Sequence, residues 1–159
     1  MKKSSNLIKS ALIAAVYTAI SLIFQPLNFG PLQLRASEAV SVLVLYTPAA
    51  PWGLFLGCVI TNIFSPYGLL DAVAGSMATL TAALIARRIK NRHLAMLPFV
   101  LVNAAVVSFV ICFTSATMQL YFINFLYLAL SESLSVYILG EGIVRLIDKE
   151  PKIKEFLER

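Results

Sequence analysis

Charged residues are scarce in this chain. Only 13% of its 159 residues are Asp, Glu, Lys or Arg, whereas roughly 25% is usual in soluble domains. Hydrophobic residues make up 59% of the chain, which is more than a soluble fold of this length would bury. The composition therefore excludes an ordinary soluble domain and predicts an integral membrane protein.

Residue patterns that carry enzymatic chemistry are also missing. No G-x-x-x-x-G-K-[ST] loop is present to cradle nucleotide phosphates, and H-E-x-x-H is absent. The chain holds a single histidine, His93, so we expect neither a Ser-His-Asp hydrolase nor a histidine-based metal site. Cys58 and Cys112 lie in apolar runs and match no metal-binding spacing. We expect binding or transport rather than enzyme activity, with no catalytic residue, metal or bound cofactor.

Long apolar runs predict the membrane-spanning helices. Five apolar stretches are present, and one of them, 37–65, is interrupted by "TPAAPWG", which favours two short helices joined by a proline turn. That pair either crosses the membrane obliquely or forms a re-entrant hairpin. The other four runs are long enough to span the bilayer and cover roughly 7–24, 70–86, 94–113 and 119–140. We predict a single all-α membrane domain over 1–159, a compact bundle of about six transmembrane helices.

Basic residues indicate how the chain is oriented. They gather before the span at 7–24, between the spans at 70–86 and 94–113, and in a short tail at about 145–159. The positive-inside rule places all three clusters in the cytoplasm, so we expect a multi-pass protein of the cell membrane with both termini inside. The net charge of +5 then reflects contact with anionic lipid and needs no nucleic-acid partner. Arg35 is left alone on the outer side, in the loop "QPLNFGPLQLR".

Three carboxylates lie in or beside apolar segments, where an ionised carboxylate costs several kcal/mol unless it is paired. Glu38 has a structural explanation as the first-turn partner of an N-cap Ser37, paired with Arg35. Asp71 is placed to cap the span that follows "SPYG". Glu132, within "LALSESLSVY", has no comparable explanation, which favours a functional role. Glu141 is near the inner end of the last span and is expected to reach the interface.

Helix geometry predicts where the polar residues meet. Counting about 1.5 Å per residue, Asn103 and Glu132 reach a similar depth near the middle of the membrane. Asn62 flanks the outer turn. An alternative role for Asn62 and Asn103 is to form hydrogen bonds between helices. These depths predict a polar pocket that opens outward and reaches towards the membrane centre, formed by Arg35, Glu38, Asn62, Asp71, Asn103 and Glu132.

Small residues recur at every fourth position in three segments, a spacing that lets helices approach closely. The three stripes are Ala11, Ala15 and Ala19; Gly53 and Gly57; and Ala78, Ala82 and Ala86. We expect one or two of them to pack within the protein and a surplus face to meet a partner subunit.

Four runs together resemble the QueT family: "FGPLQLRASEA", "TPAAPWGLFLGCVITNI", "GLLDAVAGSMATLTAAL" and "LPFVLVNA". Members of that family are queuosine-precursor substrate-binding (S) components of energy-coupling factor (ECF) transporters. The resemblance implies a compact six-helix S component that captures a scarce nutrient outside the cell. It also implies docking through Ala11, Ala15 and Ala19 onto a transmembrane coupling (T) subunit, driven by two cytoplasmic ATPases, so that ATP is used by the partner subunits.

The substrate that the resemblance implies is a 7-deazaguanine, in its aminomethyl or cyano form or as queuine. Such a base offers adjacent N–H donors to a carboxylate and a carbonyl oxygen to an Asn or Arg donor, and Tyr67 or Tyr121 is available for stacking. Arg35 and Glu38 would close the outer mouth of the pocket over the ligand. When the pocket is empty, one option is that the two side chains pair with each other. The implied substrate-binding residues are Arg35, Glu38, Asn62, Tyr67, Asp71, Asn103 and Glu132; which carboxylate takes the guanine edge stays open.

Three other functions remain open at this stage. The first is an S component for another vitamin, such as riboflavin, biotin or thiamine. The second is a small self-sufficient transporter that uses Glu132 as a proton carrier. The third is a membrane assembly protein without a small ligand, whose polar residues would be buried against one another.

Overall fold

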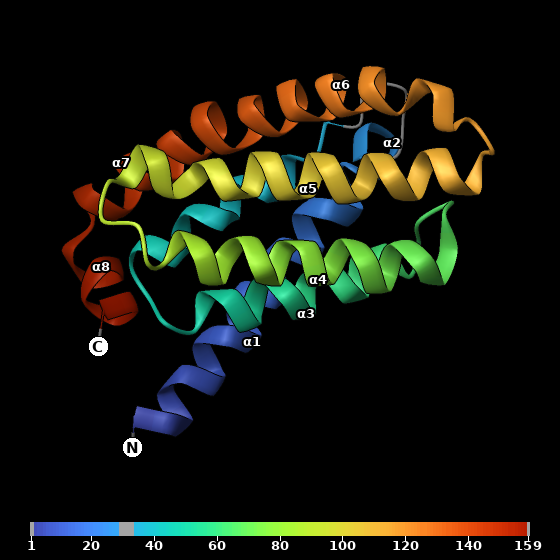
Figure 1. Ribbon diagram of the computed structural model, residues 1–159. Coiled ribbons are helices and arrows are strands. Elements are labelled where there is room, and N and C mark those ends of the chain that lie inside the picture. Colours follow the sequence, from blue (N-terminus) through green and yellow to red (C-terminus); the bar gives the residue numbers. More distant parts are fainter. Residues whose placement is uncertain (1, 29–33, 159) are drawn as a thin grey trace.

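Helices make up nearly all of this computed structural model, which describes residues 2–28 and 34–158 (Figure 1). No strand occurs among these residues, which confirms the all-α class. The elements, in order, are α1 (Lys2–Ile23), α2 (Gln25–Asn28), η1 (Ala36–Leu45), α3 (Ala50–Asn62), α4 (Gly68–Ala86), α5 (Arg92–Thr114), η2 (Met118–Leu120), α6 (Tyr121–Ser133), η3 (Leu134–Leu139), α7 (Gly140–Lys149) and α8 (Pro151–Glu158).

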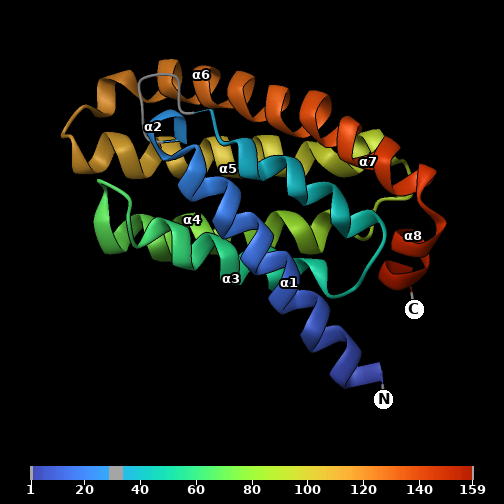
Figure 2. The same cartoon turned by 180° about the vertical axis from the view of Figure 1, so that it is seen from behind.

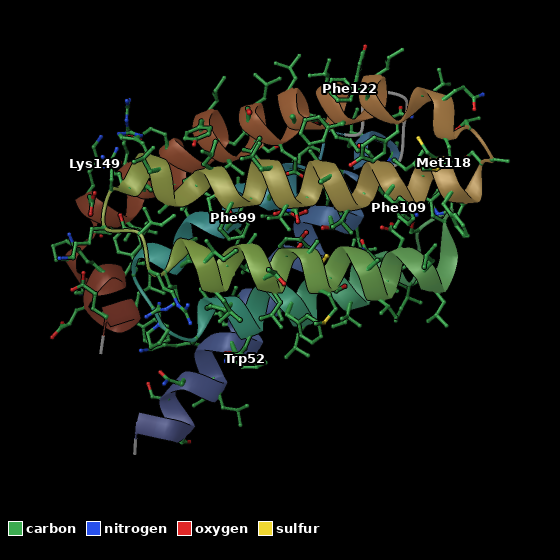
Figure 3. All side chains as sticks on the ribbon, in the orientation of Figure 1. Trp52, Phe99, Phe109, Met118, Phe122 and Lys149 are labelled. Atoms are coloured by element: carbon green, nitrogen blue, oxygen red, sulfur yellow. The ribbon has the colours of Figure 1, made fainter. Side chains whose placement is uncertain are left out.

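The exterior of the bundle is apolar, as a membrane protein requires. Four helical segments are long and apolar enough to cross a membrane: Ser4–Ile23, Gly68–Ala86, Arg92–Thr114 and Met118–Lys149. Phe122 projects from α6 away from the bundle, whereas Phe99 on α5 is fully buried (Figure 3). Because large apolar side chains cover the outside and four helical segments are long and apolar enough to span a membrane, the prediction of an integral membrane bundle is confirmed.

The interrupted stretch forms η1 and α3, joined by a turn at 46–49. η1 is a 3-10 helix rather than an α-helix. A 3-10 helix rises about 2.0 Å per residue, so its ten residues reach further than an α-helix of equal length. Arg87, which follows α4, donates from Nη1 to the carbonyl oxygen of Val44 at 3.2 Å, so the turn lies at the same end of the bundle as the α4–α5 loop. The pair therefore runs the length of the bundle and is not a re-entrant hairpin.

η1 passes through the middle of the bundle, where its cyan ribbon lies between α1 and α5 in both views (Figures 1 and 2). It contacts α1, α3, α4, α5, η3 and α7. Its sequence, ASEAVSVLVL, is apolar on nearly every side, and most of its residues are buried, as expected for a helix without a solvent face. The central position of η1 takes Glu38, in its first turn, into the protein interior.

The two termini lie at the same end of the bundle (Figures 1 and 2). The α8 helix folds back there, and Lys9 of α1 donates from Nζ to the carbonyl oxygen of Leu157 at 3.3 Å. Tyr46, in the turn after η1, donates to Asp148 at 3.3 Å. Burial, with a further contribution from Asp148, raises the pKa of Tyr46 to about 12, so the phenol keeps the proton that it donates. Glu141 also lies at this end, where Arg92 donates to both of its oxygens at 2.7 Å.

Two of the three small-residue stripes are used within the protein. Gly53 and Gly57 of α3 lie against α1, and the stripe on α4 is buried. The third stripe lies on the outer surface of α1, where its members Ala11, Ala15 and Ala19 are exposed. The α1 helix therefore packs on α3 with one face and leaves a small-residue face uncovered in the described structure.

Replacing Gly53 with alanine tests the α1–α3 contact. A Cβ atom at this position would lie 2.7 Å from Cβ of Ile13 and 2.7 Å from the carbonyl oxygen of Ser10, so one helix must shift. We expect Gly53→Ala to lower the free energy of unfolding by about 1–3 kcal/mol, measured by thermal or denaturant unfolding in detergent.

Gly142 in α7 provides the matched control. A Cβ atom there has no neighbour within 4 Å, and alanine is the better helix former by up to about 1 kcal/mol. Gly142→Ala should leave stability unchanged or raise it slightly. Equal effects of the two substitutions would contradict close packing at Gly53.

Candidate functional site

Six polar residues from five elements come together inside the bundle. Each is at most 5% exposed, although an unpaired charge is costly in such an environment. Arg35 immediately precedes η1, and the others lie at the first turn of η1, the end of α3, the start of α4, and within α5 and α6. We call Arg35, Glu38, Asn62, Asp71, Asn103 and Glu132 the buried polar cluster.

Asn62 joins three of these elements. Its Oδ1 accepts a hydrogen bond from Nη2 of Arg35 at 2.9 Å, and its Nδ2 donates to the carbonyl oxygen of Asp71 at 3.1 Å. Nδ2 also lies 3.4 Å from Sγ of Cys58. A Cβ atom at Gly75 would come within 2.8 Å of the same Nδ2, so a glycine at this point of α4 leaves room for the amide. Asn62 thereby holds the guanidinium of Arg35 against α3 and α4.

Glu38 is held by α1 rather than by Arg35. Its Oε1 accepts a hydrogen bond from the hydroxyl of Tyr17 at 2.6 Å. Ser37 does not cap the helix, because η1 begins one residue earlier, with Arg35 in the N-cap position and no side-chain cap. Arg35 and Glu38 interact electrostatically, but no ion pair joins them among the residues described. Both the capping role and the direct pairing expected from their three-residue spacing are therefore wrong in this structure.

Asp71 has a partner in the preceding turn. Its Oδ2 accepts a hydrogen bond from the hydroxyl of Ser65 at 2.6 Å, and Oγ of Ser65 accepts from the backbone N–H of Tyr67 at 3.2 Å. The N-cap residue of α4 is Tyr67, which makes no side-chain cap. The capping role expected for Asp71 is therefore wrong, although its place in the first turn suits a carboxylate because of the helix dipole. Tyr67 is half-buried in the turn between α3 and α4 and is not part of the buried polar cluster.

Asn103 and Glu132 form the deeper part of the cluster. Oγ1 of Thr79 lies 3.4 Å from Oδ1 of Asn103 and 3.6 Å from Sγ of Cys58, which connects Asn103 to the α3–α4 side. Glu132 interacts electrostatically with Glu38 and Arg35. It is the penultimate residue of α6, just before the π-helical segment η3, a local irregularity that is common at functional sites.

Several polar atoms of the cluster have no hydrogen-bond partner within residues 2–28 and 34–158. Leaving such an atom buried and unpaired costs about 1–3 kcal/mol, and native proteins contain few of them. Two of the atoms are donors and three are acceptors: Nη1 of Arg35, Nδ2 of Asn103, Oε2 of Glu38, Oδ1 of Asp71 and Oε2 of Glu132. This arrangement suits a small polar ligand that carries both N–H donors and an acceptor.

Sequence reasoning missed three side chains that hold the cluster in place: Tyr17, Ser65 and Thr79. Tyr17 had a readable signal, because it lies on the face of the first helix opposite the alanine stripe and is the only residue with a polar ring there. Ser65 and Thr79 had none, since their partners depend on how distant segments pack. The loop expected to cover a ligand includes 29–33, which lie outside the described residues.

The sequence matches the profile of a family described as QueT transporter over residues 7–149. It is also similar to the queuosine precursor transporter QueT of Lactococcus lactis subsp. cremoris (strain MG1363). The two are 27% identical over 84 residues, which cover 50% of this chain and 49% of that protein. The match thus spans about half the length of that relative. No solved structure matches the chain.

Removing the hydroxyl of Tyr17 tests the packing of the cluster. Tyr17→Phe keeps the ring but deprives Oε1 of Glu38 of its donor, so we expect the free energy of unfolding in detergent to fall by about 1–3 kcal/mol. Tyr127→Phe, on the exposed surface of α6, should change it by less than about 0.5 kcal/mol. Equal stability of the two variants would show that the Tyr17–Glu38 hydrogen bond contributes nothing.

Proposed function

The chain belongs to the QueT transporter family, and we propose on that basis that it binds a queuosine precursor as the S component of an ATP-driven ECF importer. The ligand is a 7-deazaguanine: the aminomethyl form, the cyano form or queuine. The chain itself performs no catalysis and binds no cofactor, and ATP is used by its partner subunits.

The unpaired atoms of the buried polar cluster carry this proposal. A 7-deazaguanine presents a ring N–H next to an exocyclic amine, and a carbonyl oxygen beside them. Oε2 of Glu38 suits the N–H donors, and Nη1 of Arg35 or Nδ2 of Asn103 suits the carbonyl oxygen. Because the Arg35 and Glu38 side chains are held by different partners, Asn62 and Tyr17, each keeps one polar atom for the ligand.

Aromatic stacking on the base has a candidate at the outer turn. Tyr67 is half-buried at the start of α4, close in sequence to Ser65 and Asp71 of the site. Tyr121 donates its hydroxyl to the carbonyl oxygen of Ala105 at 3.3 Å, which holds it against α5. We assign stacking to Tyr67 because it lies in the same turn as Ser65, which holds Asp71 of the site.

The uncovered face of α1 supports a partner in the membrane. We assign Ala11, Ala15 and Ala19 to docking on the T subunit, because this stripe is exposed while the other two are packed inside the protein. A stripe of small residues allows close helix approach, which favours a helical transmembrane partner over lipid. Two cytoplasmic ATPase subunits complete the proposed assembly.

We assign the end that holds both termini to the cytoplasm. The basic clusters of the N-terminus, the α4–α5 loop and the tail all lie at that end, in agreement with the positive-inside rule. Arg35 and the outer turns then face the cell exterior, from which the ligand enters. The protein would be a multi-pass subunit of the cell membrane.

Calorimetric titration of the purified protein in detergent tests the substrate. The ligands are 7-cyano- and 7-aminomethyl-7-deazaguanine and queuine, with guanine, riboflavin, biotin and thiamine as controls. We expect saturable binding of at least one deazaguanine and none of the vitamins. Binding of a vitamin instead would make the protein an S component for that vitamin. In a separate assay, ligand uptake into vesicles that lack ATPase subunits would identify a self-sufficient transporter. Either result would overturn the proposal.

A bulky side chain in the alanine stripe tests docking. We expect Ala15→Trp to reduce co-purification with the T subunit by about tenfold or more while ligand affinity stays unchanged, because a large ring prevents close helix approach. Thr81→Trp, at an exposed small residue of α4, provides the control and should assemble normally. Equal recovery of the complex with both variants would place the docking surface elsewhere.

A further inference from the structure

The charges of the buried polar cluster do not balance. It contains three carboxyl groups and a single guanidinium, that of Arg35. The other buried cation among the described residues is Lys9, which is bound to Leu157 at the end that holds both termini. Because buried carboxylates are stable only when paired with a cation, a proton or strong donors, this excess of acidic groups requires further partners of one of these kinds.

Two of the three carboxyl groups are partly compensated. Arg35 interacts electrostatically with both Glu38 and Asp71. Each of these also accepts a short hydrogen bond from a hydroxyl, Tyr17 for Glu38 and Ser65 for Asp71, both at 2.6 Å. The positive charge of Arg35 is thus shared by the outer pair.

Glu132 is the least compensated of the three. It is 2% exposed, and its Oε2 has no hydrogen-bond partner in the part of the chain that the structure describes. It is close enough to interact electrostatically with both Glu38 and Arg35, but neither makes a hydrogen bond or an ion pair with it among the residues described. Of the three carboxyl groups, Glu132 therefore has the greatest need of a positively charged or proton-donating partner.

A metal ion does not account for this charge. Among residues 2–28 and 34–158, no group of three His, Cys, Asp or Glu side chains is arranged to hold one. The three carboxyl groups therefore do not converge on one point. Each of them keeps one unpaired oxygen, Oε2 of Glu38, Oδ1 of Asp71 and Oε2 of Glu132, so separate donors of one ligand can each meet a different group.

We propose that the site selects a cationic ligand and that Glu132 receives its positive charge. This inference rests on the proposed function and specifies which precursor is taken. A 7-aminomethyl-7-deazaguanine carries a primary amine, which is protonated at neutral pH as a lysine side chain is. The cyano form has the same ring but no charge. The ring is held at its guanine edge by Arg35 and Glu38, and the ammonium group extends from position 7 to Glu132.

The test compares the two ligands calorimetrically on the wild-type protein and on Glu132→Gln. The wild type should bind the aminomethyl form about tenfold or more tighter than the cyano form, the scale of one charge-assisted hydrogen bond. Glu132→Gln should lose most of that preference, because it weakens binding of the aminomethyl form and leaves the cyano form nearly unchanged. Glu38→Gln should weaken both ligands to a similar degree.

Two further variants separate charge from folding. Glu132→Asp keeps the carboxyl group and should retain a preference for the aminomethyl form. Glu141→Gln removes a carboxylate that pairs with Arg92 outside the cluster, and it should change the affinity for neither ligand. Thermal unfolding without ligand establishes that each variant is folded.

The outcomes distinguish this inference from the proposed function. If the cyano form binds the wild type as tightly as the aminomethyl form, or if Glu132→Gln weakens both ligands equally, the inference fails while the deazaguanine assignment stands. If the wild type binds queuine but neither of these two forms, the inference fails while the deazaguanine assignment stands, and if it binds none of the three, the proposed function fails first.

Discussion

Burying a guanidinium inside an apolar helical bundle is the constraint on which the rest of this structure depends. An isolated ion costs several kcal/mol there, so Arg35 is stable only with partners close by. Asn62 supplies a direct hydrogen bond, while Glu38 and Asp71 supply opposite charge. These partners come from three separate elements, and η1 must pass through the centre of the bundle to bring them together. Arg35 thus ties the position of η1 to the arrangement of the polar interior.

The partners of Arg35 are in turn held by neutral groups. Tyr17 fixes Glu38, Ser65 fixes Asp71, and the amide of Asn62 is held between Arg35 and the backbone of α4. Tyr17 and Ser65 each use one oxygen of a carboxyl group and leave the other oxygen unpaired. A site of this kind is prepared for a ligand before the ligand arrives, which lowers the ordering cost of binding.

The alternation of apolar runs and basic clusters was sufficient to predict the helices and the pairing of two short helices around a proline turn. The rarity of charge was sufficient to single out the four charged residues of the buried polar cluster, and helix geometry added the two asparagines at matching depths. Partners were harder to predict. Local spacing suggested that Glu38 caps a helix and pairs with Arg35, whereas η1 turns Glu38 towards Tyr17, a residue of α1 that is distant in sequence. The 3-10 form of η1, which sets that direction, follows from packing on six neighbouring elements and is not encoded in a short pattern.

The α1 helix connects the two surfaces on which the proposed function depends. Its inner face carries Tyr17, which holds Glu38, and its outer face carries the exposed alanine stripe. Gly53 and Gly57 let this helix lie close against α3. A movement of α1 on the docking partner would therefore also move Tyr17 and, through their hydrogen bond, Glu38. Under the proposed function, docking and ligand capture therefore share one structural element.

The most direct test of the account is an experimental structure of the protein with 7-aminomethyl-7-deazaguanine bound. The account predicts the base inside the buried polar cluster, with hydrogen bonds of about 2.7–3.2 Å from Nη1 of Arg35 and to the carboxyl oxygens of Glu38 and Glu132. A ligand found instead in the apolar crevice beside Tyr127 and Leu130, with the cluster unchanged, would contradict it.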